Sequence, residues 1–229
     1  MLAQRLSGRW FSTRLRVKQM NKPLVKGPAR IGTRERILAA AQDAIIEKGF
    51  EATSVDEIAA AVGISRAGYF YHFPDKNALA RALIDQQIED EGEMLAGIMA
   101  RAAEFSDDPL QRMLIMMRLM AERYVELPGG YTGCILASAI FQDRLFDSEV
   151  KAANRRANLA FRDRFVAQFT AIAEAYPPRD PVDPGEMADM LNVVITGAIV
   201  VSRGLREPQV LAQQMLLART MVKAVYAGR

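Results

Sequence analysis

The residues best suited to chemistry gather in one short stretch, GISRAGYFYHFPDKNAL, from Gly63 to Leu79. It combines an arginine, Arg66, with a run of aromatic rings and the only histidine of the chain, His72. Large rings normally lie in a protein core, and guanidinium groups bind planar partners through two parallel hydrogen bonds. The stretch is therefore either a dense piece of core or a surface that presents rings and a charge to a partner.

Other kinds of chemistry lack the residues they need. The chain has 229 residues with one cysteine, Cys134, and one histidine. An internal disulfide, a cysteine-based zinc site and a Ser-His-Asp triad therefore have no support. No glycine-rich phosphate loop and no spaced carboxylate cluster is present either. We expect a protein that is not an enzyme, binds no cofactor or metal, and works in a reducing, cytoplasmic setting.

Positive charge is concentrated at the N-terminus. The whole chain carries a net charge of only +3, and Glu35 is the sole acid among its first 36 residues. The basic segment indicates either an anionic partner at one end of the molecule or a solvated, disordered arm. Its Lys and Arg residues are Arg5, Arg9, Arg14, Arg16, Lys18, Lys22, Lys26, Arg30, Arg34 and Arg36.

The first 19 residues allow two interpretations. They are rich in arginine and free of acids, which is typical of a transit peptide. Alternatively Met20 is the true start, which we prefer because the folded body begins so soon after it. No membrane span is expected, since the longest apolar run, Met190 to Val201, is interrupted by Asn192 and is shorter than the ~20 residues required.

Apolar residues follow helical spacing throughout, and no strand pattern is present. Ser54 and Glu57 form a capping box, Gly63 supplies a positive φ for a turn, and Pro74 ends a short helix. This arrangement predicts a helix-turn-helix. The expected N-terminal helices cover residues 33–48, 54–62, 65–73 and 76 to about 103.

The remainder of the chain predicts longer helices that pack as a bundle. We expect an all-α fold with a basic, disordered arm (residues 1–31), a helix-turn-helix domain (32–79) and a larger helical domain (80–229). The expected C-terminal helices cover residues 109–126, 134–141, 148–176, 183–204 and 208–226.

Several motifs resemble the TetR family of transcriptional regulators. They are TSVDEIAAAVGIS at 53–65, YHF at 71–73 and Asp75-Lys76, followed by an apolar helix. The resemblance covers roughly residues 33–80. It implies an N-terminal helix-turn-helix DNA-binding domain, and a C-terminal bundle that binds a small-molecule effector and forms a homodimer.

The resemblance also implies which residues contact double-stranded DNA. The third helix enters the major groove, where Arg66 can bind guanine and an aromatic edge can meet a thymine methyl group. Many relatives have glycine where this chain has Ala67, and tyrosine where it has Phe70. The expected DNA-binding residues are Thr53, Ser54, Ser65, Arg66, Ala67, Tyr71, His72 and Lys76.

The family layout further implies an effector pocket between the central helices and a dimer built from residues 183–204 and 208–226. A repressor released from an inverted-repeat operator by a hydrophobic effector is the expected function. A transcriptional activator of the same fold and a helical interaction protein that does not bind DNA remain open. It also remains open whether the pocket residues are simply part of the core, and whether the Cys134 thiol is inert or acts as a sensor. The expected pocket residues are Met113, Met116, Met117, Met120, Tyr124, Cys134, Phe141, Phe161 and Phe165.

Overall fold

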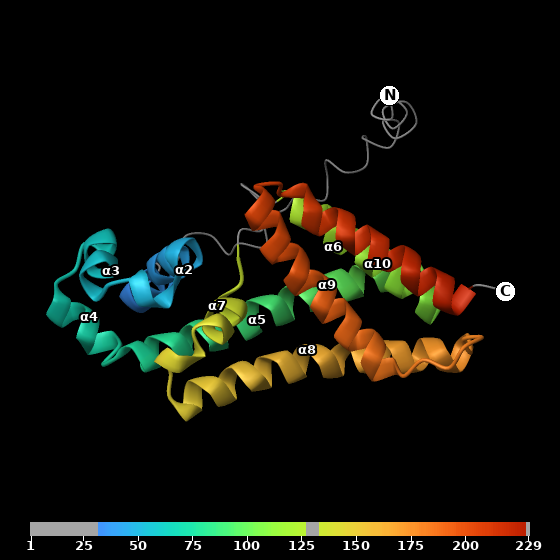
Figure 1. Ribbon diagram of the computed structural model, residues 1–229, viewed down its shortest axis with the longest axis horizontal. Helices are drawn as coiled ribbons and strands as arrows, with labels where there is room; N and C mark the ends of the chain where they lie inside the picture. Colours follow the sequence, from blue (N-terminus) through green and yellow to red (C-terminus); the bar gives the residue numbers. More distant parts are fainter. Residues whose placement is uncertain (1–31, 127–132, 228–229) are drawn as a thin grey trace, which may run out of the picture. The chain divides into compact units, whose positions relative to one another are not determined.

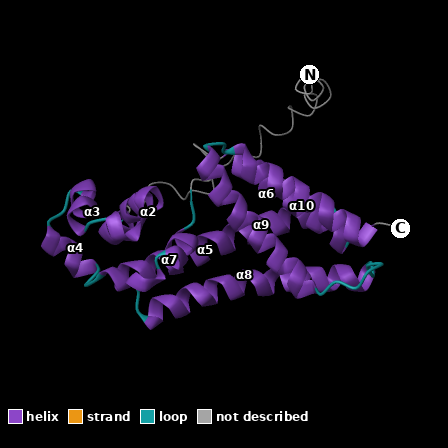
Figure 2. Cartoon of the chain, in the orientation of Figure 1, coloured by secondary structure: helices purple, strands orange, loops and turns teal. Residues whose placement is uncertain are grey.

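The computed structural model describes residues 32–126 and 133–227. Within these ranges the regular structure is entirely helical, as predicted (Figures 1 and 2). The basic arm and most of the loop expected at 127–133 lie outside the described residues. The helices are α2 (Thr33–Ala52), α3 (Val55–Val62), α4 (Arg66–His72), α5 (Lys76–Ala103), α6 (Pro109–Glu126), α7 (Ile135–Phe141), the 3₁₀ helix η1 (Asp143–Leu145), α8 (Ser148–Ala175), α9 (Pro184–Leu205) and α10 (Gln209–Ala227).

The short N-terminal helices begin and end where their own side chains direct. The Ser54 hydroxyl accepts a hydrogen bond from the Glu57 backbone N–H at 3.1 Å and caps α3. Ser65 caps α4 in the same way, accepting from the Gly68 N–H at 3.1 Å. Gly63 ends α3 with a left-handed φ of 73°, a conformation that other residues adopt only under strain. The predicted helix-turn-helix is confirmed.

The regular part of α2 ends at Gly49, as expected, where φ is 88° and ψ is 165°. A side chain at this position would be strained, and its Cβ would lie 3.0 Å from the amide of Gln142. The same amide oxygen accepts a hydrogen bond from the Phe50 N–H at 2.7 Å. Because Gln142 follows directly after α7, that helix holds the end of α2 in place.

One hydrophobic cluster holds the helix-turn-helix together. Tyr69 and Phe73 are 0% and 2% exposed, and their ring centroids lie 6.1 Å apart. They share the cluster with apolar residues of α2, α3, α5, α7 and α8. Part of the aromatic run in α4 is therefore core, and α7 and α8 contribute to the same core as the helix-turn-helix.

A second cluster fills the larger helical body, where α10 packs along α6 and α9 packs along α8 (Figure 1). Phe165 and Phe169 are completely buried in it. The change from the first cluster to the second occurs within α5, between Ile84 and Leu95. The domain boundary expected after residue 79 remains a prediction, since α5 runs through it without a break.

Among the described helices, α9 alone is long and apolar enough to cross a membrane, judged by length and composition. Its start is well defined. The Asp183 carboxylate accepts from the N–H groups of Gly185 at 2.7 Å and Glu186 at 3.2 Å, and Pro184 occupies the first turn. The helix packs against α8 and α10, which gives it a place in a helical bundle.

Candidate functional site

The short helix α4 divides its aromatic residues between two faces. Tyr69 and Phe73 point into the core, whereas Tyr71 is 86% exposed. Arg66 and Ala67 in the first turn are exposed as well. An exposed ring buries almost no area and so contributes little to folding. The outer face of α4 therefore presents a charge, a small residue and a ring that the fold does not use.

The guanidinium of Arg66 belongs to the first residue of α4. It forms an ion pair with Asp56 of α3 at 2.8 Å and lies 5.6 Å from the ring centroid of Phe70. Both side chains of the pair are more than half exposed, and exposed pairs contribute only about 0–1 kcal/mol. The guanidinium can therefore leave Asp56 for a stronger, bidentate partner.

Three further predicted residues surround α4 with groups that can donate hydrogen bonds. The hydroxyls of Ser54 and Ser65 each accept a backbone N–H, which leaves the hydroxyl hydrogen available to an anion. The ammonium of Lys76 donates to the Phe50 carbonyl at 3.3 Å and has two further hydrogens. All three residues are exposed, so they suit contacts to phosphate oxygens.

Thr53 and His72 differ from the other predicted residues. Thr53 is only 4% exposed, and its hydroxyl donates to the Gly49 carbonyl at 2.8 Å. That side chain stabilises the break after α2 and offers no surface to a partner in this conformation. His72 is half-buried, with its ring edge-on to Tyr71 at a centroid distance of 5.2 Å, so it supports the exposed ring from behind.

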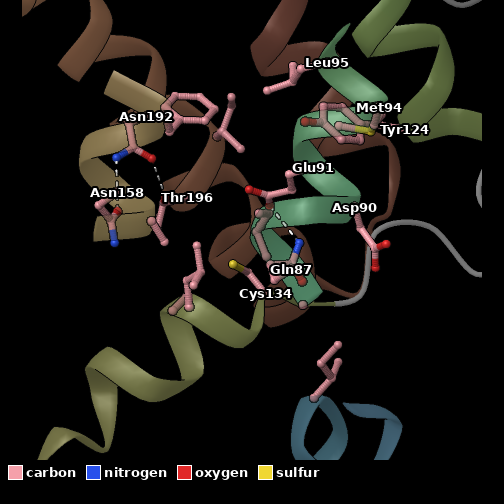
Figure 3. A pocket seen from close by; sticks show the side chains of 18 of the residues that line it. Gln87, Asp90, Glu91, Met94, Leu95, Tyr124, Cys134, Asn158, Asn192 and Thr196 are labelled. Atoms are coloured by element: carbon pink, nitrogen blue, oxygen red, sulfur yellow. Dashed lines mark hydrogen bonds between the residues drawn. The ribbon is translucent and has the colours of Figure 1, made fainter. Parts of the chain in front are cut away.

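A cavity of about 440 Å³ lies in the helical body, among residues of α2, α5, α6, α7, α8 and α9 (Figure 3). Four of the predicted pocket residues line it: Met120, Tyr124, Cys134 and Phe161. They come from the C-terminal half of α6, the start of α7 and the middle of α8. The predicted pocket residues therefore coincide with the cavity only in part.

The other five predicted pocket residues lie elsewhere. Met117 and Phe165 are completely buried in the core, and Phe141 is 73% exposed. Met113 and Met116 line a separate, smaller cavity of about 220 Å³ beside Ala102 and Gln168. The reason is the position of each residue along its helix. Residues one or two turns before Met120 on α6 face other neighbours, and Phe141 is the last residue of α7.

The sequence did not predict the polar part of the cavity wall. Gln87 donates to the Glu91 carboxylate at 2.8 Å. On the opposite wall the Asn192 amide donates to Asn158 at 3.4 Å, and the Thr196 hydroxyl donates to Asn192 at 3.5 Å (Figure 3). Gln87 with Glu91, and Asn192 with Thr196, are polar pairs spaced four apart on one helix face. That spacing is the signal that could have revealed them.

Glu91 is the most unusual group in this wall. Burial raises the pKa of its carboxyl above the ordinary value, against a smaller opposing effect of the hydrogen bond from Gln87. Figure 3 shows the carboxylate directed into the cavity. Within the part of the chain that the structure describes, no lysine or arginine forms an ion pair with it.

Cys134 lines the same cavity as a free thiol. Burial raises its pKa to about 11, and the nucleophilic form of cysteine is the thiolate. The surroundings therefore favour the inert thiol over the sensing one, the two roles left open by the sequence.

This inertness gives a direct prediction. With a pKa raised from 9.0 to about 11, the folded protein at pH 8 holds about a hundredfold less Cys134 thiolate than an ordinary cysteine would. A chromogenic aromatic disulfide should react correspondingly slowly with the native chain, and quickly after unfolding in guanidinium chloride. Because the chain has a single cysteine, the released chromophore reports this thiol alone. Native and unfolded rates within tenfold of each other would contradict the prediction.

Several large apolar side chains of α9 and α10 are exposed to solvent. Each is between 45% and 70% exposed. Two glycines on α9, Gly197 and Gly204, have no atom within 4 Å of the position where a Cβ would lie, so their backbone is open to close approach. We call this surface the α9–α10 face, and it comprises Val193, Val200, Val201, Leu205, Leu216, Leu217 and Met221.

Comparison with known proteins agrees with this geometry. The sequence profile of the family described as "Bacterial regulatory proteins, tetR family" matches residues 37–83. The probable HTH-type transcriptional regulator ArpR of Pseudomonas putida is 33% identical over 95 residues, which cover 42% of this chain and 42% of ArpR. The chain thus spans less than half the length of this curated relative.

Solved structures extend the likeness to most of the chain. A transcriptional regulator of the TetR family from Agrobacterium tumefaciens superposes with a TM-score of 0.69 at 20% identity, over 85% of this chain and 97% of that one. AibR, solved in complex with isovaleryl coenzyme A and operator DNA, gives a TM-score of 0.62 at 21% identity, over 85% and 98% of the two chains. At these identities the likeness shows a shared fold.

Proposed function

Because the chain belongs to the TetR family of bacterial regulatory proteins, we propose that it is a repressor that binds an inverted-repeat operator as a homodimer. A small-molecule effector in the 440 Å³ cavity releases it from DNA. It acts where the chromosome is, in the cytoplasm. A repressor is the simplest form of this proposal, since occupying a promoter blocks transcription without further contacts.

The observation that carries the proposal is the outer face of α4. Helix α4 is capped, and its buried rings fix it to the core while Arg66 and Tyr71 remain exposed. An α-helix fits the major groove, where arginine binds guanine O6 and N7 and an apolar ring edge meets a thymine methyl group. Ser54, Ser65 and Lys76 then contact phosphates on either side.

The dimer is proposed on the α9–α10 face. The two helices pack against each other and expose seven large apolar side chains, with open glycine backbone that permits close helix packing. A second copy of the same face covers it by twofold symmetry. The dimer then presents two copies of α4 to half-sites about one DNA turn, roughly 34 Å, apart.

We propose that a displacement of α5 couples ligand binding in the cavity to the release of DNA. Three residues separate this helix from α4, and it carries Gln87 and Glu91 into the cavity. Ile46, near the end of α2, also lines the cavity. A ligand that fits better when these helices are displaced favours the state in which the two α4 helices no longer match the operator.

Substitution of Arg66 tests the proposal. Arg66→Ala should lower affinity for the preferred duplex by about 1–3 kcal/mol and relax discrimination at one base pair of each half-site. Arg179→Ala is a matched control because Arg179 is an exposed arginine beyond the end of α8. Competition with duplexes that differ at single base pairs measures both effects. An unchanged specificity profile in Arg66→Ala would remove α4 from the recognition surface.

The two open alternatives give different outcomes in the same experiments. A transcriptional activator would show the same operator and the same Arg66 dependence, but a reporter gene would lose expression when the protein is absent. A helical interaction protein would show no sequence preference on DNA at all.

A further inference from the structure

We propose that the effector is an organic cation, a protonated amine on an apolar body, whose ammonium group binds the Glu91 carboxylate. This deepens the proposed function, on which it rests only for the regulatory role of the cavity. The proposal concerns the chemistry of the ligand, which the sequence predicted to be simply hydrophobic.

The charges of the cavity wall favour a cation. Among the described residues that line the cavity, the carboxylates are Asp43, Asp90 and Glu91, and the sole basic side chain is Arg123. A ligand carboxylate or phosphate would meet this excess of negative charge and be repelled. A positive group is attracted to the same position.

The position of Glu91 identifies where the cation binds. Its carboxylate points into the cavity (Figure 3), and its hydrogen-bond donor there is the neutral amide of Gln87 at 2.8 Å. Arg164 acts on it only as a more distant charge. A partly buried carboxylate without a cationic partner is unfavourable, which agrees with its raised pKa. A ligand ammonium within hydrogen-bond distance supplies the missing partner.

The remaining walls suit the body of such a ligand. Apolar side chains from six helices line the cavity and can cover an aromatic or aliphatic skeleton. The rings of Tyr124 and Phe161 also line the cavity, and a cation gains further attraction from an aromatic face. The apolar lining residues include Met94, Leu95, Met120, Phe161, Ile195 and Ile199.

Opposite Glu91, the hydrogen-bonded row of Asn158, Asn192 and Thr196 (Figure 3) offers amide and hydroxyl groups. Because these groups are neutral and can both donate and accept, they can orient a polar substituent at the far end of the ligand. The cavity therefore has one anionic end, a neutral polar wall opposite, and apolar surface between them.

The test compares two probes of almost equal shape, 4-phenylbenzylamine, which is protonated at pH 7, and 4-phenylbenzyl alcohol, which is neutral. Titration calorimetry with the full chain measures both affinities. Since hydrogen bonds to charged groups exceed neutral ones by about a factor of ten or more in affinity, the amine should bind at least about tenfold more tightly. Equal affinities, tighter binding of the alcohol, or no binding of the amine at millimolar concentration would overturn the proposal.

Two substitutions on α5 locate the effect. Glu91→Gln keeps the size and shape of the side chain and removes its charge, so the preference for the amine should fall to about onefold. Glu89→Gln is the matched control, because Glu89 is exposed on the same helix and lies outside the cavity wall. An amine preference that survives Glu91→Gln would contradict the assignment, and circular dichroism checks that each variant is folded.

Operator binding tests the proposed function independently of the ligand. Operator binding by the unliganded protein does not depend on Glu91. If no operator binding is found, the proposed regulatory function is rejected, and the preference for the amine can still be measured. Conversely, a protein that binds its operator but shows no preference for the amine would reject the cation alone.

Discussion

Leu217→Asp is expected to convert the protein to a monomer and to weaken operator binding about 10²- to 10⁴-fold, the gain that joining two binding modules normally gives. Leu217 is 52% exposed within the apolar α9–α10 face. In a symmetric dimer it would be covered by the partner subunit, and an aspartate there would be buried without a cation.

Sedimentation velocity and operator titration measure the two effects together. Leu145→Asp is the matched control, since Leu145 is a 38% exposed leucine in η1, outside the α9–α10 face. This control should remain dimeric. A Leu217→Asp protein that stays dimeric at micromolar concentration would show that another surface forms the dimer. A monomer with unchanged operator affinity would show that pairing is not needed for binding.

Tyr69→Ala and Tyr71→Ala are expected to have opposite consequences although they lie two residues apart on α4. Tyr69 is completely buried, so its truncation should lower the free energy of unfolding by about 3–5 kcal/mol, as for other large buried rings. Tyr71 is 86% exposed, so its truncation should leave stability unchanged within about 0.5 kcal/mol and reduce DNA affinity instead.

Urea unfolding and operator titration of both variants test this division. Tyr69→Phe refines it, because the buried Tyr69 hydroxyl has no hydrogen-bond partner among the described residues. Removing an unsatisfied hydroxyl should be neutral or stabilising, so the large loss in Tyr69→Ala belongs to the ring. A stable Tyr69→Ala protein, or a Tyr71→Ala protein with full DNA affinity, would reverse the roles assigned to the two faces.

Local signals explain why the helix-turn-helix was predicted well. Ser54, Gly63, Ser65 and Asp75 act on backbone groups within a few residues, and each caps or ends one of the expected helices. The break at Gly49 is also local in its φ angle. Helix boundaries set by caps can therefore be read from the sequence without knowledge of the tertiary fold.

The ligand cavity could not be predicted in the same way because it depends on how helices distant in sequence are rotated against each other. The sequence pattern of a methionine-rich helix is the same whether Met117 faces the core or a cavity. In the structure Met117 is core and Met120, almost one turn later, lines the cavity. The aromatic spacing on α8 had the same ambiguity, since Phe161 reaches the cavity and Phe165 does not.

The polar residues of the cavity wall, which the sequence analysis did not use, carry a clearer signal of the cavity than the apolar ones do. Glu91 and Asn192 occupy positions where a helix of the bundle would normally carry an apolar side chain, and each has a polar neighbour four residues away. Burying such groups is unfavourable unless they are hydrogen-bonded. Their presence on inward faces therefore indicates a site for a ligand or for a polar network.

Selection from a pool of random duplexes with the full chain, at two salt concentrations, tests the central claim most directly. If the protein is a dimeric, sequence-specific regulator, the enriched duplexes will contain an inverted repeat with half-sites about one helical turn apart. Their advantage over random DNA will persist at the higher salt concentration. Absence of any enriched sequence, or binding that merely falls with salt as non-specific phosphate contacts do, would contradict the claim.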